Sequence, residues 1–151
     1  MSVDLSLPRE AWTTHPHYPS QVLLLRSHAS FRSISRQLID GASRGVERDA
    51  LLEIFRWWKA SMRSHEAYEE GKLYPFLTRR FGIDTAPMAE GHDALRTADL
   101  RVRAASDTEL QAALEHHDTV LDVHLDLEES IVIPALLALE PEEFEAYLDG
   151  R

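Results

Sequence analysis

One motif occurs twice in this chain and restricts its possible folds more than any other feature of the sequence. The segment that begins at His65 reads His, three residues, Glu-Glu, four residues, Pro, and the segment that begins at His124 reads the same. A histidine and a glutamate four positions apart lie on one face of an α-helix, one turn apart. The repeat therefore predicts two helices that each present an imidazole and a carboxylate side by side.

Each copy of the motif also follows a lone histidine. His28 precedes His65 by 37 residues, and His92 precedes His124 by 32 residues. We therefore interpret the chain as two helical hairpins, each with one lone histidine and one His-x-x-x-Glu. Pairing the hairpins would bring four imidazoles and two carboxylates to one level of a helical bundle, which is how di-iron and di-manganese carboxylate sites are built.

The alternative to a metal site is a pair of ordinary surface contacts, which is the usual role of a single His-x-x-x-Glu on a helix. Two copies with matching Glu-Glu and Pro positions, each on an apolar stripe, favour the metal site, because a carboxylate inside a core needs a metal or an ionic partner. The chain has no cysteine, which excludes disulfides, zinc–thiolate sites and iron–sulfur clusters. Any metal must therefore be held by His, carboxylate, Tyr or backbone groups.

Helical periodicity continues over almost all of the chain after residue 18. We expect a first helix from residue 19 or 20 to Asp40, stopped by Gly41. A second helix should run from about Glu47 to Arg80, with its last turns kinked or ended by Pro75. The inward stripe of the second helix would consist of Leu51, Ile54, Trp58, Met62, His65, Glu69, Leu73 and Phe76.

The second half of the chain shows the same periodicity. A third helix should begin near Pro87, which is a favoured residue in a first turn. The residues Ser106-Asp107-Thr108-Glu109 form a capping box, so a fourth helix should begin there and run towards Leu139. A short amphipathic helix should follow from Pro141 to Gly150.

These expectations define the fold class. Pro8, Pro16 and the absence of a regular period predict an extended N-terminal arm over residues 1–18. Residues 19–151 should form one domain, an all-α, up-down-up-down four-helix bundle with a short C-terminal helix.

Charge and hydropathy restrict the partners. The formal net charge is −10 and the pI is near 5.2, which argues against nucleic acid and against anionic membrane surfaces. The longest apolar run, Ile131–Leu139, is too short to span a bilayer, and Met1–Trp12 lacks the features of a signal peptide. We therefore expect a cytoplasmic protein.

The duplicated motif resembles that of the hemerythrin-like, or HHE cation-binding, family over about residues 20–139. The resemblance implies a pair of iron ions joined by an oxo or hydroxo bridge, with terminal histidines and bridging carboxylates. Manganese and zinc remain alternatives to iron. Carried onto matching positions, the implied metal ligands are His28, His65, Glu69, His92, His124 and Glu128.

The sequence departs from the oxygen-carrying members of that family. Carriers place a second histidine four residues after the third-helix histidine, where this chain has Arg96, and an aspartate where it has Glu129. Fewer imidazoles and more oxygen donors favour reaction of the metal site with O2 or peroxide. The protein would then be an oxidase, an oxygenase or a peroxide-consuming protein, and an unidentified reductant would supply its electrons. The alternative is a non-catalytic module that binds or senses O2, nitric oxide or iron. Arg96 would either steady a bound peroxide or pair with Asp93, Asp99 or another acid.

Other residues near the motif have two possible roles. Glu66 could be an extra ligand or lie on a solvated face, and Glu129 could also coordinate. Tyr68 could offer a phenolate or pack in the core with its hydroxyl at the rim. His117 could orient a ligand or line an access path, or it could be an ordinary histidine at the edge of the core. His15 and His17 lie in the arm and are predicted not to be ligands.

Overall fold

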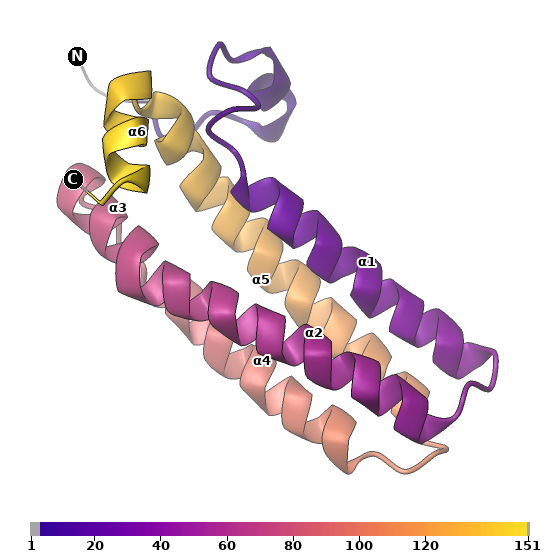
Figure 1. Cartoon of the computed structure of the whole chain (residues 1–151). Helices are drawn as coiled ribbons and strands as arrows, with labels where there is room; N and C mark the ends of the chain where they lie inside the picture. Colours follow the sequence, from indigo (N-terminus) through magenta and orange to yellow (C-terminus); the bar gives the residue numbers. More distant parts are fainter. Residues whose placement is uncertain (1–3, 151) are drawn as a thin grey trace.

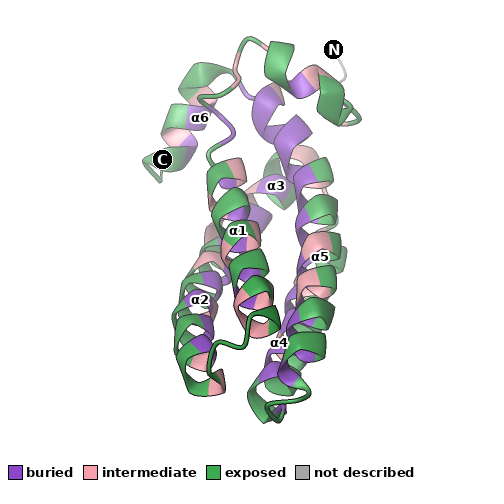
Figure 2. Cartoon of the chain, turned by 90° about the vertical axis from the view of Figure 1, so that its right-hand side faces the viewer, coloured by how far each residue is buried: buried purple, intermediate pink, exposed green. Residues whose placement is uncertain are grey.

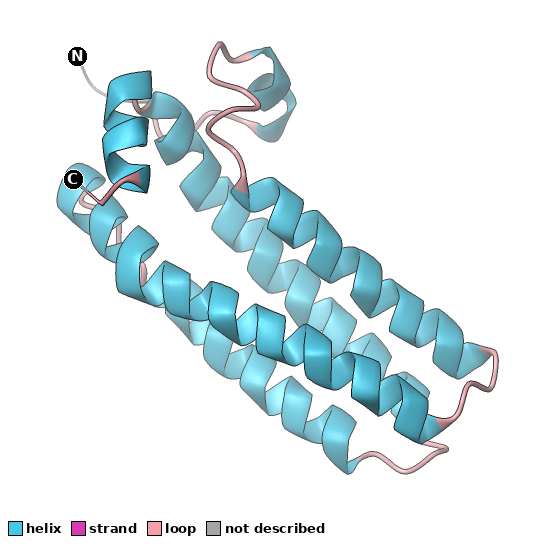
Figure 3. Ribbon diagram, viewed as in Figure 1, coloured by secondary structure: helices cyan, strands magenta, loops and turns pink. Residues whose placement is uncertain are grey.

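Every regular element of the described chain is helical (Figure 3). The description rests on a computed structural model and covers residues 4–150. Met1 to Val3, at the start of the predicted arm, and Arg151, at the end of the predicted bundle, lie outside the described residues. In chain order the elements are η1 (Arg9–Thr14), α1 (Leu24–Ser43), α2 (Arg48–Tyr68), η2 (Glu69–Leu73), α3 (Tyr74–Phe81), α4 (Ala86–Ala104), α5 (Leu110–Ala138) and α6 (Pro141–Leu148).

The four long helices α1, α2, α4 and α5 lie along one another and form a helical bundle (Figure 1). Helix α5 packs against both α1 and α4, and α2 packs against the same two helices. The prediction of an all-helical bundle is confirmed, whereas a simple four-helix description is incomplete, because the described chain contains six α-helices. Within residues 4–150 no helix combines the length and the apolar character needed to cross a membrane.

Some predicted boundaries are wrong by several residues. Helix α1 begins at Leu24 and continues to Ser43, so Gly41 lies inside the helix and does not stop it. The reason for a glycine there is close packing, since a Cβ at Gly41 would lie 2.9 Å from Cδ2 of Leu51 on α2. In the capping box, the backbone N–H of Ser106 does bond the Glu109 carboxylate, but the regular helix begins only at Leu110.

The helix that carries the first motif does not end at its proline. Between α2 and α3 the backbone forms one π-helical segment, Glu69–Leu73, and the helix then continues through Pro75 to Phe81. A π turn adds a residue to the helix without ending it, and such turns are frequent at functional sites. The second motif lies in a continuous α5, with Pro134 inside the helix.

The inward stripe of α2 is partly wrong. Ile54 is 49% exposed, and Phe55, which is 2% exposed, takes its place in the core. Leu51, Phe55, Trp58 and Met62 follow the spacing of four, three and four residues that keeps side chains on one helix face. Phe76 is only half-buried.

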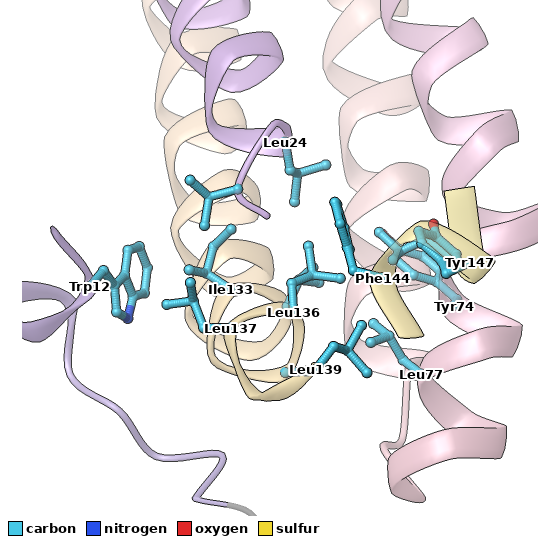
Figure 4. Close-up of a cluster of buried hydrophobic side chains, with 14 of the residues drawn as sticks. Trp12, Leu24, Tyr74, Leu77, Ile133, Leu136, Leu137, Leu139, Phe144 and Tyr147 are labelled. Atoms are coloured by element: carbon cyan, nitrogen blue, oxygen red, sulfur yellow. The ribbon is translucent and has the colours of Figure 1, made fainter. Parts of the chain in front are cut away.

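The buried residues lie mainly on the inner faces of the long helices (Figure 2). They form two hydrophobic clusters, one towards each end of the bundle. The cluster near α6 includes Leu24, Leu136 and Phe144 (Figure 4). The second cluster lies at the other end of the long helices and includes Phe31 and Leu125. On each long helix the predicted metal ligands lie where the two clusters meet; on α1, for example, His28 lies between Leu24 and Phe31.

The N-terminal arm is not extended. Residues Arg9–Thr14 form a 3-10 helix that packs against α5. Trp12 is buried in the cluster near α6, and its indole N–H donates a hydrogen bond to the carbonyl of Leu7. A buried indole needs such a partner, so one aromatic residue fixes the arm to the bundle.

Candidate metal centre

The six side chains predicted as metal ligands converge at one level of the bundle. Five of them are buried to 3% exposure or less, and His65 keeps 11% of its side chain exposed. They come from α1 (His28), α2 (His65), the π-helical segment (Glu69), α4 (His92) and α5 (His124 and Glu128). The level of the bundle at which the two hydrophobic clusters meet is therefore polar on every long helix.

The six residues form two overlapping groups. Within each group one ligand atom per residue lies within 4.8 Å of the others. The first group, called here the His28 half, consists of His28, His65, Glu69 and Glu128. The second, the His92 half, consists of Glu69, His92, His124 and Glu128. Both carboxylates belong to both groups, so each half offers two imidazoles and two carboxylates that could hold a metal ion.

Unpaired polar atoms at the centre test whether metal ions fit. Both carboxylate oxygens of Glu69, both ring nitrogens of His124 and one oxygen of Glu128 are buried without a hydrogen bond. Each such buried atom costs roughly 1–3 kcal/mol unless it has a partner. The Nε2 atoms of His28 and His65 also face each other at 3.3 Å. Nitrogen and oxygen donors aimed at the same points are what metal ions require, so the donor set fits a metal pair.

The two carboxyl groups shared by both halves titrate as a pair. Burial raises the pKa of Glu128 to about 7, and the neighbouring Glu69 adds to the rise. For Glu69, burial is outweighed by the imidazoles of His65 and His92, each with a ring nitrogen 3.3 Å from a carboxylate oxygen, which hold the pKa well below its usual range. Burial together with a second carboxylate therefore disfavours a charge on Glu128, and positive charge at the centre would favour ionisation of both groups.

The second glutamate of each motif orients a histidine of the other hairpin. The Nδ1–H of His28 donates to Glu129 at 2.8 Å, and the Nδ1–H of His92 donates to Glu70 at 2.7 Å. Such a bond fixes the imidazole so that Nε2 faces the centre, as in many metal sites. Glu129 belongs to neither group of converging atoms and acts on His28 instead of joining the ligands.

The same bonds set the charge of the two lone histidines. Burial alone would lower the pKa of His28, but the adjacent carboxylates of Glu128 and Glu129 raise it to about 9. Burial is likewise outweighed at His92, where Glu69 and Glu70 raise the pKa to about 9. Both imidazoles therefore lie in surroundings that favour a positive charge, which a metal ion would supply.

His124 depends on a glycine in the neighbouring helix. A Cβ at Gly91 would lie 2.1 Å from Nδ1 of His124, so only a glycine leaves room for this ring. Burial, followed by the positive neighbour His92, lowers the pKa of His124 to about 4. The sequence analysis missed Gly91, although its place directly before His92 is a visible signal.

Tyr74 is a second residue that the sequence analysis missed. It is 4% exposed, and its hydroxyl donates to the carboxylate of Glu128 and lies 3.3 Å from Nε2 of His92. Burial and the nearby charge of Glu128 raise the pKa of Tyr74. In a regular helix a residue five positions after Glu69 would point away from it, whereas a π turn stacks residues five apart. The π-helical segment thus brings Tyr74 to the centre.

Arg96 lies outside the centre. Its side chain is 41% exposed and bonds Asp93 at 3.1 Å and Glu66 at 3.3 Å. Pairing with Asp93 is one of the alternatives considered above, and Glu66 is the further acid. Glu66 itself is 3% exposed and belongs to neither ligand group, so its assignment to a solvated face is wrong. Burial raises the pKa of Glu66.

The corresponding arginine of the first hairpin is more deeply placed. Arg32, four residues after His28 as Arg96 is four after His92, bonds Glu129 at 2.7 Å and also bonds two aspartates of α5. Arg9 of the arm bonds the other oxygen of Glu129 at 2.9 Å. Together with His28, these cations hold the pKa of Glu129 at about 2 against the effect of burial. An arginine four residues after each lone histidine was a signal that sequence reasoning did not use.

The remaining histidines lie apart from the two groups. His117 is buried, bonds Asp99 at 2.8 Å and packs against aromatic rings in the cluster at the far end, as an ordinary core histidine does. His116 is exposed. In the arm, His15 bonds the backbone of His17, whose Nδ1 lies 3.1 Å from a carbonyl of α5.

A comparison with protein families decides the relationship. The family model of the hemerythrin HHE cation-binding domain matches residues 21–143. The chain belongs to this family. All six converging residues fall within the match, and their His/Glu cluster could bind metal ions. Searches of curated proteins and of solved structures gave no match to this hemerythrin-family chain.

Proposed function

We propose that this hemerythrin-family protein is a non-heme di-iron protein that reduces O2 or peroxide. The observation that carries the proposal is the pair of four-residue groups that share Glu69 and Glu128. Each group offers two imidazole nitrogens and two carboxylate oxygens, a donor set suited to iron. The two carboxylates would bridge the ions, and each ion would keep positions open to a small molecule.

The choice of reaction follows from the donors. When bound, a pair of iron ions can supply two electrons to one O2 or peroxide molecule. Each half of this centre has only two imidazoles, and Arg96 stands where the oxygen carriers have one more histidine. Oxygen-rich donor sets stabilise oxidised iron, which favours reduction of the bound molecule over its reversible release.

Reduction of peroxide to water also needs protons, and Tyr74 holds one beside the centre. Its hydroxyl donates to Glu128, and burial together with that carboxylate raises its pKa, so the phenol stays protonated at neutral pH. The same oxygen lies 3.3 Å from Nε2 of His92 and could also serve as a ligand in the His92 half. In either role Tyr74 would distinguish this half from the other.

The decisive experiment is reduction of iron-loaded protein without oxygen, followed by addition of O2 or hydrogen peroxide. Visible absorbance and the amount of oxidant consumed are measured together, with Glu128→Ala as the control that lacks the centre. We expect rapid oxidation, and repeated turnover of peroxide when a reductant is added. A coloured adduct that loses its colour under argon, with no net consumption, would overturn this proposal in favour of a carrier or sensor.

A further inference from the structure

A pocket with a volume of about 230 Å³ opens beside the metal centre. It lies between the beginning of α1, the end of α2 and the short helix α6. Its wall is mainly apolar and includes Leu24, Leu136 and Phe144, which Figure 4 shows together with Tyr147 of α6. Leu73 of the π-helical segment completes the apolar side.

The pocket reaches the centre through His65, whose ring forms part of its wall. His65 is also the most accessible of the six converging side chains, with 11% exposure against 1% or less for each of the others. In the His92 half both imidazoles are 1% exposed or less: Tyr74 is buried against His92, and His124 is packed on Gly91. A molecule that approaches the centre through this pocket therefore meets the His28 half.

The lining of the pocket restricts what can bind there. No aspartate, glutamate, lysine or arginine belongs to the wall, so a charged molecule would lose its water without gaining an ionic partner. Besides the imidazole of His65, the polar groups are hydroxyls and one amide: Ser27, the hydrogen-bonded pair Tyr68 and Tyr147, and Gln21. The side-chain amide nitrogen of Gln21 donates to two carbonyls at the end of α5, so the hydroxyls and the side-chain oxygen of Gln21 are left for a ligand.

The volume sets the size of the ligand. An apolar cavity of about 150 Å³ holds one benzene ring. A pocket of about 230 Å³ therefore holds one ring with one or two small substituents, and it is too small for most drug-sized or nucleotide-sized molecules.

We infer that this pocket binds an uncharged, phenol-sized molecule that serves as the electron donor of the centre, with its ring among Leu24, Leu136 and Phe144 and its hydroxyl towards the polar side of the wall. The inference rests on the proposed function, with hydrogen peroxide as the oxidant. Two phenols each lose one electron and the hydroxyl proton, the O–O bond of one peroxide breaks, and the products are two phenoxyl radicals and two water molecules.

The pocket is tested by titration calorimetry with 4-methylphenol on iron-loaded protein and on zinc-loaded protein, since zinc keeps the site filled but transfers no electron. The variant Ser27→Phe should fill the pocket, because Ser27 is half-buried in its wall. Ser30→Phe is the matched control on the same helix, at an exposed position outside the pocket. We expect 4-methylphenol to bind both metal forms, Ser27→Phe to weaken binding at least tenfold and Ser30→Phe to leave it unchanged.

A second variant and a charged analogue keep the test decisive. Phe144→Ala removes one wall and should admit the bulkier 4-tert-butylphenol, whereas the anion 4-methylbenzoate should bind poorly to every form. Equal binding of 4-methylphenol by the unaltered protein and Ser27→Phe, or equal binding of phenol and benzoate, would overturn the inference. If binding follows these expectations but no peroxide is consumed, the pocket would be confirmed as a phenol site and the proposed redox function would be wrong.

Discussion

In the His28 half of the centre one imidazole borders a pocket, whereas in the His92 half both imidazoles are enclosed. His65 is partly exposed beside α6, and His124 is pressed against the backbone of Gly91. The motif is the same in both hairpins, so the difference comes from the residues around it. In the proposed function, an open position and a closed position at one centre would separate the entry of substrate from the retention of metal.

The outer residues differ in the same way. Glu129, which orients His28, is 1% exposed and held by Arg32 and Arg9. Glu70, which orients His92, is 43% exposed, and the structure gives it no arginine partner among the described residues. In the His28 half the glutamate that orients the lone histidine is thus held more firmly. In the His92 half, Tyr74 and Gly91 position the histidines instead.

Removal of a shared carboxylate should have the largest effect, since it damages both halves. We expect unaltered protein to hold about two iron ions per chain. Glu69→Ala or Glu128→Ala should reduce this to less than half an ion and lower the melting temperature, because metal binding is coupled to folding. Elemental analysis and thermal unfolding measure the two effects. His116→Ala, an exposed control on α5, should change neither, and iron retained in both Glu variants would show that the assignment is wrong.

Gly91→Ala should disrupt metal binding in the His92 half alone. The added methyl would meet Nδ1 of His124 at 2.1 Å and push the ring away from the centre, so metal content should fall by about one ion per chain. Gly71→Ala is the matched control, since a Cβ there has no atom within 4 Å. Metal content of both variants is measured after identical iron loading. Full occupancy in Gly91→Ala would mean that His124 is not needed to hold the second ion.

Tyr74→Phe should have a smaller effect on metal binding, and the effect should again be confined to the His92 half. The substitution removes the hydroxyl that contacts Glu128 and His92 but keeps the buried ring, so iron should remain bound with roughly tenfold weaker affinity. Peroxide turnover should slow, and the visible spectrum of the oxidised protein should change. Tyr18→Phe, which lies outside both ligand groups and outside the pocket beside His65, serves as the control. Identical spectra of Tyr74→Phe and unaltered protein would place the hydroxyl outside the metal pair's reach.

The smallest effects are expected at the two arginines, and they should be unequal. Arg32→Ala removes a partner of buried Glu129 and should lower metal affinity and thermal stability measurably. Arg96→Ala removes a side chain that is 41% exposed, so metal affinity should hardly change, as is usual for exposed ion pairs. Competition with a chelator ranks the two variants. If Arg96→Ala proved the more damaging, the support of the two halves would be the reverse of that described here.

The sequence was sufficient to predict which six side chains converge. The spacing of four residues on a helix and the repetition of the motif predict which face of each hairpin points towards the other hairpin. The structure brings all six side chains together. Their role as iron ligands stays a prediction. The family relationship and the all-helical fold were also predictable, and both predictions are confirmed.

The errors have physical causes that a fixed helical period cannot represent. Tyr74 reaches the centre only because the π-helical segment changes the angle per residue after Glu69. Ile54 and Phe55 are adjacent and both apolar, so the sequence alone gave no means of choosing which one faces inward. The burial of Glu66 depends on Arg96 of another helix, and such pairs between helices follow from packing rather than from local spacing.

The exchange of outer glutamates between the hairpins has a consequence for how the chain is held together. Hairpin one supplies three of the four donors of the His28 half, but the remaining donor and the partner of His28 come from hairpin two, and the converse is true of the His92 half. A filled centre would therefore clamp the hairpins to each other independently of the peptide link at residues 82–85. Two separate fragments could assemble the same centre, and the covalent connection would then matter mainly for the local concentration of one hairpin near the other.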